Sequence, residues 1–130
     1  ESVGCAVALE VALAKPARAL VLESPFESIP AMARTRLPFL PLGPFIRTRY
    51  DNMARVPQLR MPLLVLHGTR DEIVPFNQGM RVFDAAPPPK TFYAIEGAGH
   101  NDTYLVGGRA YWKDLADFLT PLAPPLAAAP

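Results

Sequence analysis

Residues 62–75 read PLLVLHGTRDEIVP, and this stretch decides the fold class. Its first part is a short apolar run that stops at Gly68, which is typical of a strand buried on both faces of a sheet. Two similar runs, ALVL at 19–22 and TFYAI at 91–95, are bounded by proline, glycine or charged residues. The sequence therefore predicts three short buried strands.

Helical patterns separate these predicted strands. Residues 5–14 (CAVALEVALA) are rich in alanine and leucine, which predicts a nearly buried helix. Asn77 is placed to cap a second helix that runs to residue 85, and apolar side chains recur at helical spacing after the third strand, at Tyr111, Leu115, Phe118 and Leu119. Because strands that alternate with helices form parallel sheets, we predict an α/β fold, a parallel sheet with helices on both faces.

A proline-rich excursion, residues 25–61, separates the first two predicted strands. It holds six of the 16 prolines of the chain, which permit at most short helices such as one over residues 31–36. Residues 31–60 contain six arginines and one aspartate. We interpret this segment as a solvated surface, and the alternative is that it contacts an anionic membrane surface.

Composition limits the function classes. A chain of 130 residues that is 50% hydrophobic can form one domain at most, and a net charge of +1 lacks the excess of basic residues expected of a nucleic-acid-binding protein. The single cysteine, Cys5, excludes a disulfide within the chain and a cysteine-rich metal site. No uncharged stretch reaches the roughly 18 apolar residues of a membrane span. The Pro/Ala-rich residues 121–130 predict a disordered or extended tail after a folded unit over residues 1–120.

Three residues with catalytic potential lie in turns or loops next to the predicted helices and strands. Ser2 directly precedes the alanine-rich helix, at a sharp turn that would expose its hydroxyl. Gly4 would allow close packing there, and the Val3 N–H would point toward a developing oxyanion. Asp71 follows the second strand, and His100 follows the third in EGAGHND. Parallel strands end at one edge of a sheet, so we expect the three side chains there. A serine needs a base, and the base needs an acid to orient it.

The motifs resemble those of the alpha/beta-hydrolase superfamily. ESVGCAVALE resembles its nucleophile elbow G-x-S-x-G without the first glycine, LLVLHGTRDEIVP its acid loop, and EGAGHND its histidine loop, in the family order Ser, Asp, His. The similarity runs from Ser2 to about residue 119 and is greatest to small serine hydrolases that include acyl-protein thioesterases. The resemblance implies Ser2 as nucleophile, His100 as general base, Asp71 as its orienting acid and Val3 N–H as an oxyanion donor. It implies no cofactor and no metal.

The resemblance also implies a substrate class and a domain organisation. The substrate would be a small-molecule or acyl-protein ester or thioester. Residues 25–61 would form a lid, whose apolar side chains either line an acyl pocket or pack a small core of their own: Phe26, Leu37, Phe39, Leu40, Phe45 and Ile46. We expect residues 1–120 to be the C-terminal part of one alpha/beta-hydrolase domain, and Glu1–Pro130 alone to lack measurable esterase activity. A cytoplasmic location and membrane association through an N-terminal segment both stay open.

Each site residue has an alternative. Ser2 would also suit an ordinary helix N-cap. His67 is the only competing base and is predicted to be a hydrogen-bonded structural residue. Asp71 competes with Glu72 and Asp102, neither of which has a counterpart in the family. Zinc bound by both histidines and Asp71 lacks an H-E-x-x-H or paired-cysteine spacing. A non-catalytic binding scaffold of the same fold is the alternative function.

Overall fold

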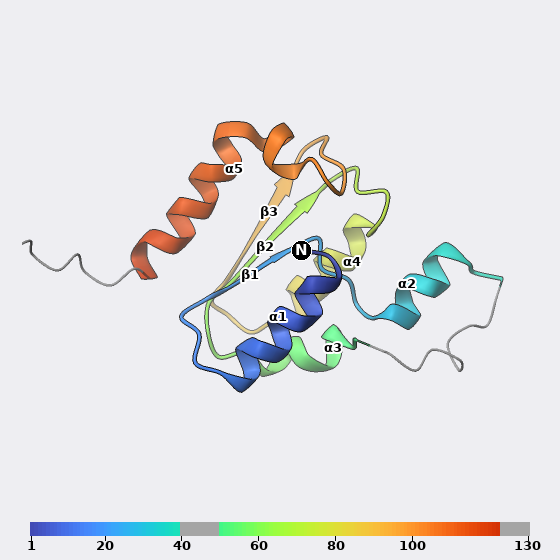
Figure 1. Cartoon of the computed structure of the whole chain (residues 1–130), viewed down its shortest axis with the longest axis horizontal. Helices are drawn as coiled ribbons and strands as arrows, with labels where there is room; N and C mark the ends of the chain where they lie inside the picture. Colours follow the sequence, from blue (N-terminus) through green and yellow to red (C-terminus); the bar gives the residue numbers. More distant parts are fainter. Residues whose placement is uncertain (40–49, 123–130) are drawn as a thin grey trace, which may run out of the picture.

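The computed structural model describes residues 1–39 and 50–122. Figure 1 shows helices on two sides of a small sheet. In chain order the elements are α1 (Val3–Ala14), β1 (Leu20–Glu23), α2 (Ile29–Arg36), α3 (Asn52–Arg55), the 3-10 helix η2 (Val56–Gln58), β2 (Leu63–Gly68), α4 (Phe76–Ala85), β3 (Lys90–Ile95), α5 (Thr103–Leu119) and the 3-10 helix η3 (Thr120–Leu122).

The described strands form one parallel sheet in the order β1-β2-β3, as the sequence predicts. Leu63 of β2 pairs with Leu20 of β1 on one side and with Lys90 of β3 on the other. The central strand β2 is buried at every position. This burial explains why its sequence is a continuous apolar run and not an alternating one.

Helices cover both faces of the sheet, which confirms the predicted layers (Figure 1). On one face, α1, η2 and α4 pack on the strands through a core that includes Leu9, Leu22, Val56, Leu63, Val65 and Val82. On the other face, α5 packs through Tyr111, Leu115 and Phe118 on Leu64, Leu66 and Ile95. Alternate residues of β2 therefore serve two separate cores.

Helix α1 is less buried than its sequence predicts. Cys5 and Leu9 are fully buried against β1, but Val3, Val7 and Val11 are 48%, 51% and 54% exposed. These three valines recur every four residues and so lie on one side of the helix. β1 is an edge strand of the described sheet, and no described element covers this side of α1.

Helix α4 begins one residue before its predicted cap. Pro75 occupies the N-cap position, and its carbonyl accepts the N–H of Gln78 at 2.8 Å. The prediction that Asn77 caps this helix is therefore wrong. Proline is well suited to the start of a helix because its φ is already fixed and the lost N–H would have no partner there.

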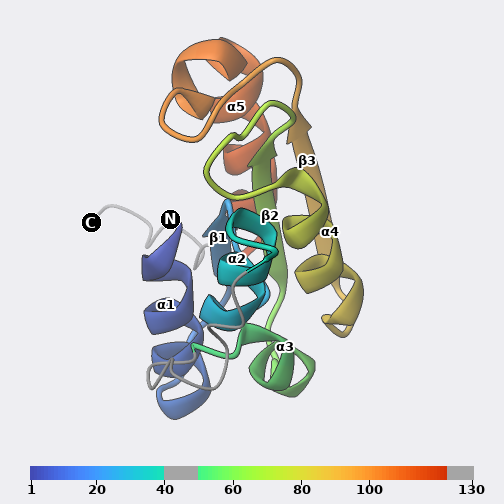
Figure 2. The ribbon, with the colours of Figure 1, turned by 90° about the vertical axis from the view of Figure 1, so that its right-hand side faces the viewer.

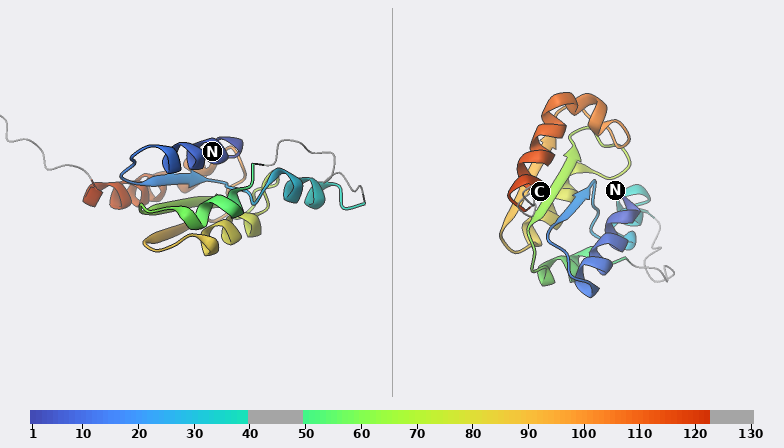
Figure 3. Two further views of the ribbon diagram at one scale, coloured as in Figure 1. Left: turned by 90° about the horizontal axis from the view of Figure 1, so that it is seen from below. Right: turned by 60° about the vertical axis from the view of Figure 1, so that its left-hand side comes forward.

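The described part of the excursion contains only short helices, as the prolines predict. Ser28 caps α2, since its Oγ accepts the Ala31 N–H at 3.2 Å. Figure 3 shows α2 projecting beyond the carboxyl ends of the strands. Side chains from α2 and from the loop before it bind the acid loop and α4: Arg36 donates to the Ile73 carbonyl at 2.6 Å, and Glu27 pairs with Arg81.

The predicted acyl-pocket residues separate into two groups. Phe26 packs with Ala6 and Val74 in a small core of its own, whereas Leu37 and Phe39 are exposed. Leu40, Phe45 and Ile46 lie outside the described residues, as does most of the predicted tail. The described part of the excursion therefore packs against the acid loop.

Candidate active site

The loops after β2 and β3 leave the same end of the sheet (Figure 2). They bring Asp71 and His100 together. His100 Nδ1 lies 2.8 Å from Asp71 Oδ2, and the two residues are 6% and 7% exposed. The competing carboxylates make other contacts. Glu72 is exposed, and Asp102 accepts the Gly99 N–H at 2.7 Å.

Asp71 is held in the orientation that this contact requires. Its Oδ1 accepts the backbone N–H groups of Ile73 at 2.9 Å and Val74 at 2.7 Å, which leaves Oδ2 for His100. Burial opposes ionisation of the carboxyl, but the hydrogen bonds from His100 and the backbone outweigh it and hold the pKa of Asp71 below its ordinary value. The buried Ser24 hydroxyl acts in the same direction, although its geometry falls short of a full hydrogen bond.

An ionised Asp71 fixes the tautomer of His100. A carboxylate only accepts hydrogen bonds, so Nδ1 of His100 must carry a proton toward Asp71. Nε2 is then the unprotonated nitrogen of the neutral ring and is available to take a proton. This is the arrangement of acid and base in a Ser-His-Asp triad.

His67 is confirmed as a buried, hydrogen-bonded residue. Its Nε2 lies 3.0 Å from the Val74 carbonyl and 3.4 Å from Asp71 Oδ2, so Nε2 carries the proton. Its Nδ1 has no partner in the described part of the chain and faces Gly79, where a Cβ would lie only 2.0 Å away. Burial lowers the pKa of His67 and keeps the ring neutral. A fully enclosed imidazole of this kind cannot reach a substrate.

Ser2 has the backbone of a strained turn. It lies at the N-cap position of α1 with φ 51° and ψ −124°, and its side chain does not cap the helix. A positive φ is costly for a residue with a Cβ, so the surrounding contacts must hold it there. Its N–H donates to the carbonyl of Glu23, at the end of β1, at 2.9 Å. The ordinary N-cap interpretation therefore does not fit, and the hydroxyl is left free.

Ser2 and His100 both lie near the edge of the sheet where the strands end. No hydrogen bond joins them in the described residues, whereas His100 bonds Asp71. Catalytic hydrogen bonds are often long in a protein without substrate. Val3 is the first residue of α1, so its N–H is among those without an acceptor inside the helix.

Gly68, and not Gly4, is the glycine that close packing requires. In the described part of the molecule, a Cβ on Gly4 would meet no atom within 4 Å, so the expectation for that position is wrong. A Cβ on Gly68 would lie 2.4 Å from the carbonyl oxygen of Ala98 and 2.5 Å from that of Gly99. Gly68 thus lets the histidine loop approach β2, a role that its position at a strand end did not reveal.

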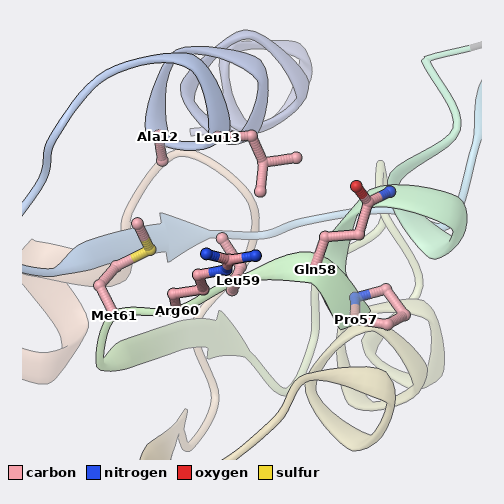
Figure 4. A pocket seen from close by; sticks show the side chains of 7 residues that line it. All are labelled: Ala12, Leu13, Pro57, Gln58, Leu59, Arg60 and Met61. Carbon is pink, nitrogen blue, oxygen red and sulfur yellow. The ribbon is translucent and has the colours of Figure 1, made fainter.

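A separate groove of about 640 Å³ lies at the opposite end of the sheet (Figure 4). Ala12, Leu13 and residues 57–61 line it, near the C-terminus of α1 and before the start of β2. Ser2 lies at the other end of α1, about 15 Å along the helix axis from Ala12. The groove is therefore not part of the site around His100.

Two other kinds of feature are absent from the described residues. They contain no group of three or more side chains arranged to hold a metal ion. They also contain no helix that is both long enough and apolar enough to cross a bilayer.

Comparison with known proteins identifies the family, although no family model matches the chain. A Mycobacterium tuberculosis protein of uncharacterised function is 38% identical over 95% of this chain and 44% of its own length. The alpha/beta hydrolase domain-containing protein WAV2 of Arabidopsis thaliana is 35% identical over 82% of this chain and 40% of its own length. The esterase domain of a Rhodothermus marinus protein superimposes with a TM-score of 0.64 at 25% identity, over 89% of this chain and 57% of that chain. The chain belongs to the alpha/beta-hydrolase superfamily.

This alpha/beta-hydrolase chain spans less than half the length of the two relatives. Its parallel sheet with helices on both faces agrees with the fold of these hydrolases. The closer resemblance to acyl-protein thioesterases stays a prediction.

Proposed function

We propose that the protein is a serine hydrolase that cleaves carboxylic esters or thioesters with Ser2, His100 and Asp71. The main support is the buried Asp71–His100 hydrogen bond of 2.8 Å. The strained turn of Ser2, bonded through its N–H to the end of β1, supports the choice of nucleophile. Membership of the alpha/beta-hydrolase superfamily supports the same chemistry.

The proposed reaction has two halves. Ser2 Oγ attacks the acyl carbon while His100 Nε2 takes the hydroxyl proton, and the carboxylate of Asp71 stabilises the imidazolium that forms. The Val3 N–H donates to the oxyanion. His100 then protonates the leaving alcohol or thiol. A water molecule next attacks the acyl-serine with His100 as base, which releases the acid and restores Ser2.

The substrate class rests on likeness to other proteins. The Rhodothermus marinus domain is an esterase, which favours an ester over an amide bond. An acyl-protein thioester is the narrower possibility drawn from the sequence resemblance. Two of the six arginines in residues 31–60 bond other parts of the chain at its surface, since Arg36 bonds the Ile73 carbonyl and Arg55 pairs with Glu10 at 2.6 Å. Contact of this segment with an anionic membrane surface stays an expectation.

A fluorophosphonate probe tests the nucleophile. The chain has three serines, at positions 2, 24 and 28, so peptide mass spectrometry assigns the label to one of them. We use the whole gene product that contains this chain, because the chain spans only part of its relatives. Labelling and hydrolysis of short p-nitrophenyl esters should both disappear in Ser2→Ala.

Ser28→Ala is the matched control. Ser28 caps α2 through Oγ, so this variant removes a hydroxyl with a structural role and should keep both labelling and hydrolysis. Label on Ser24, or labelling that survives Ser2→Ala, would show that Ser2 is not the nucleophile. A folded wild-type protein that neither labels nor hydrolyses esters would favour the non-catalytic scaffold.

A further inference from the structure

Glu23 connects the two halves of the candidate site. Its backbone carbonyl, at the end of β1, accepts the Ser2 N–H at 2.9 Å and the Cys5 Sγ–H at 3.1 Å. Burial raises the pKa of the Cys5 thiol, so the thiol stays protonated and can donate. The carbonyl of one residue thus holds the first turn of α1, where the nucleophile lies.

The Glu23 side chain reaches α5, the helix that directly follows the histidine loop. Its Oε1 accepts the hydroxyl of Thr103, and its Oε2 lies 3.4 Å from the hydroxyl of Tyr111. Thr103 is only 3% exposed, is the first residue of α5 and follows His100 by three positions. Burial and the charge of Glu23 raise the pKa of Tyr111, so the phenol also remains a donor. The carboxylate therefore fixes the start of α5 and, with it, the end of the loop that bears His100.

Fold stability alone does not explain a carboxylate at this position. Glu23 is half-buried, and no Lys, Arg or His side chain of the described residues forms an ion pair with it. A partly desolvated charge without a cation is costly, and an apolar side chain at the end of a buried strand would avoid that cost. What the carboxylate provides instead is a pair of directed contacts to a second element, α5.

We infer that Glu23 is a positioning residue for the hydrolysis reaction. It would set the distance between Ser2 and His100 by bonding the nucleophile turn through its carbonyl and the start of α5, directly after the histidine loop, through its carboxylate. This inference rests on the proposed function. A shift of about 1 Å in such a geometry is enough to cost about 100-fold in rate.

The test separates positioning from structure by comparing variants on both sides of the Glu23–Thr103 contact. Glu23→Leu and Thr103→Val should each lower kcat for a p-nitrophenyl ester, and the rate of fluorophosphonate labelling, by about 10- to 100-fold with KM little changed. Glu23→Gln and Thr103→Ser keep an acceptor or a donor and should stay within about threefold of wild type. The double variant Glu23→Leu/Thr103→Val should be no slower than the slower of the two single variants, because both substitutions remove the same contact.

Thr120→Val is the matched control, since the Thr120 hydroxyl bonds the Ala116 carbonyl at the far end of α5. It should leave kcat unchanged, and all rates are compared well below each variant's Tm. Equal rates for wild type, Glu23→Leu and Thr103→Val would overturn the inference. So would equal losses in Glu23→Gln and Glu23→Leu, because charge and not bonding would then be responsible. Labelling that survives Ser2→Ala would instead overturn the proposed function.

Discussion

Replacing Asp71 with asparagine changes one atom of the site and should nearly abolish catalysis. The backbone N–H groups of Ile73 and Val74 both point at Oδ1, so the carbonyl oxygen of an asparagine would take that position. Its NH₂ group would then stand 2.8 Å from His100 Nδ1, where the carboxylate now accepts. Two N–H donors cannot face each other, so His100 would place its proton on Nε2.

The size of the effect follows from that tautomer change. With Nε2 protonated, His100 cannot take the proton of Ser2, and the typical cost in a Ser-His-Asp triad is about 10⁴ in kcat. This factor corresponds to about 5.5 kcal/mol of transition-state stabilisation. The fold should survive, because the side chain keeps its shape and its two backbone contacts.

The assay measures kcat on a short p-nitrophenyl ester, Tm by circular dichroism, and the ¹⁵N shifts of the His100 ring by NMR. Glu72→Gln is the matched control, because Glu72 is the adjacent carboxylate and is exposed. It should be nearly silent. Equal losses in Asp71→Asn and Glu72→Gln, or an unchanged His100 tautomer in Asp71→Asn, would refute the assignment of the acid.

Three further variants test the surroundings of this pair. Because burial holds the pKa of His67 below its ordinary 6.5, the unfolded chain takes up a proton that the folded protein refuses, and the free energy of unfolding should fall as pH drops below that value. The change of this free energy with pH should reach about 1.4 kcal/mol per pH unit, as measured by urea unfolding at a series of pH values. This pH dependence should be smaller in His67→Gln, whereas an unchanged dependence would show that another group causes it. Gly79→Ala should lower stability by about 1–3 kcal/mol, since its Cβ would overlap His67, and an unchanged Tm would contradict the packing described. Gly68→Ala should lower kcat more than it lowers Tm, because its Cβ would displace the loop before His100, and kinetics equal to wild type would show that the loop adapts freely.

Local pattern was enough to predict the layers of the fold. The three apolar runs form strands within about one residue of their predicted bounds. A strand buried on both faces is a continuous apolar run, so its ends are marked by the first polar residues, glycines or prolines. The exposed side of α1 was not predictable in this way. Val3, Val7 and Val11 have the composition of a buried helix, and only their neighbours in space decide whether they are covered.

The acid was the site residue for which the sequence left the most alternatives. Asp71 and Glu72 are adjacent, and the choice between them rested on the family resemblance. The structure adds a local physical reason. A short aspartate side chain can accept the N–H groups two and three residues further along, as Asp71 does with Ile73 and Val74, while a longer glutamate suits that turn poorly.

Departures from local rules gather at one edge of the sheet. Among the described non-glycine residues only Ser2, Ser24 and Tyr50 have a positive φ, and the two serines lie at the end of β1 or bonded to it. Glu23, a half-buried carboxylate with no ion-pair partner among the described residues, precedes Ser24 and accepts the Ser2 N–H. Such features lower stability and are commonly found where a function needs them. The contacts that maintain them join residues far apart in sequence, Glu23 to Thr103 and Gly68 to Ala98, so no short motif reveals them. The elbow, acid-loop and histidine-loop motifs identify which groups react, but contacts of this long-range kind determine where those groups stand.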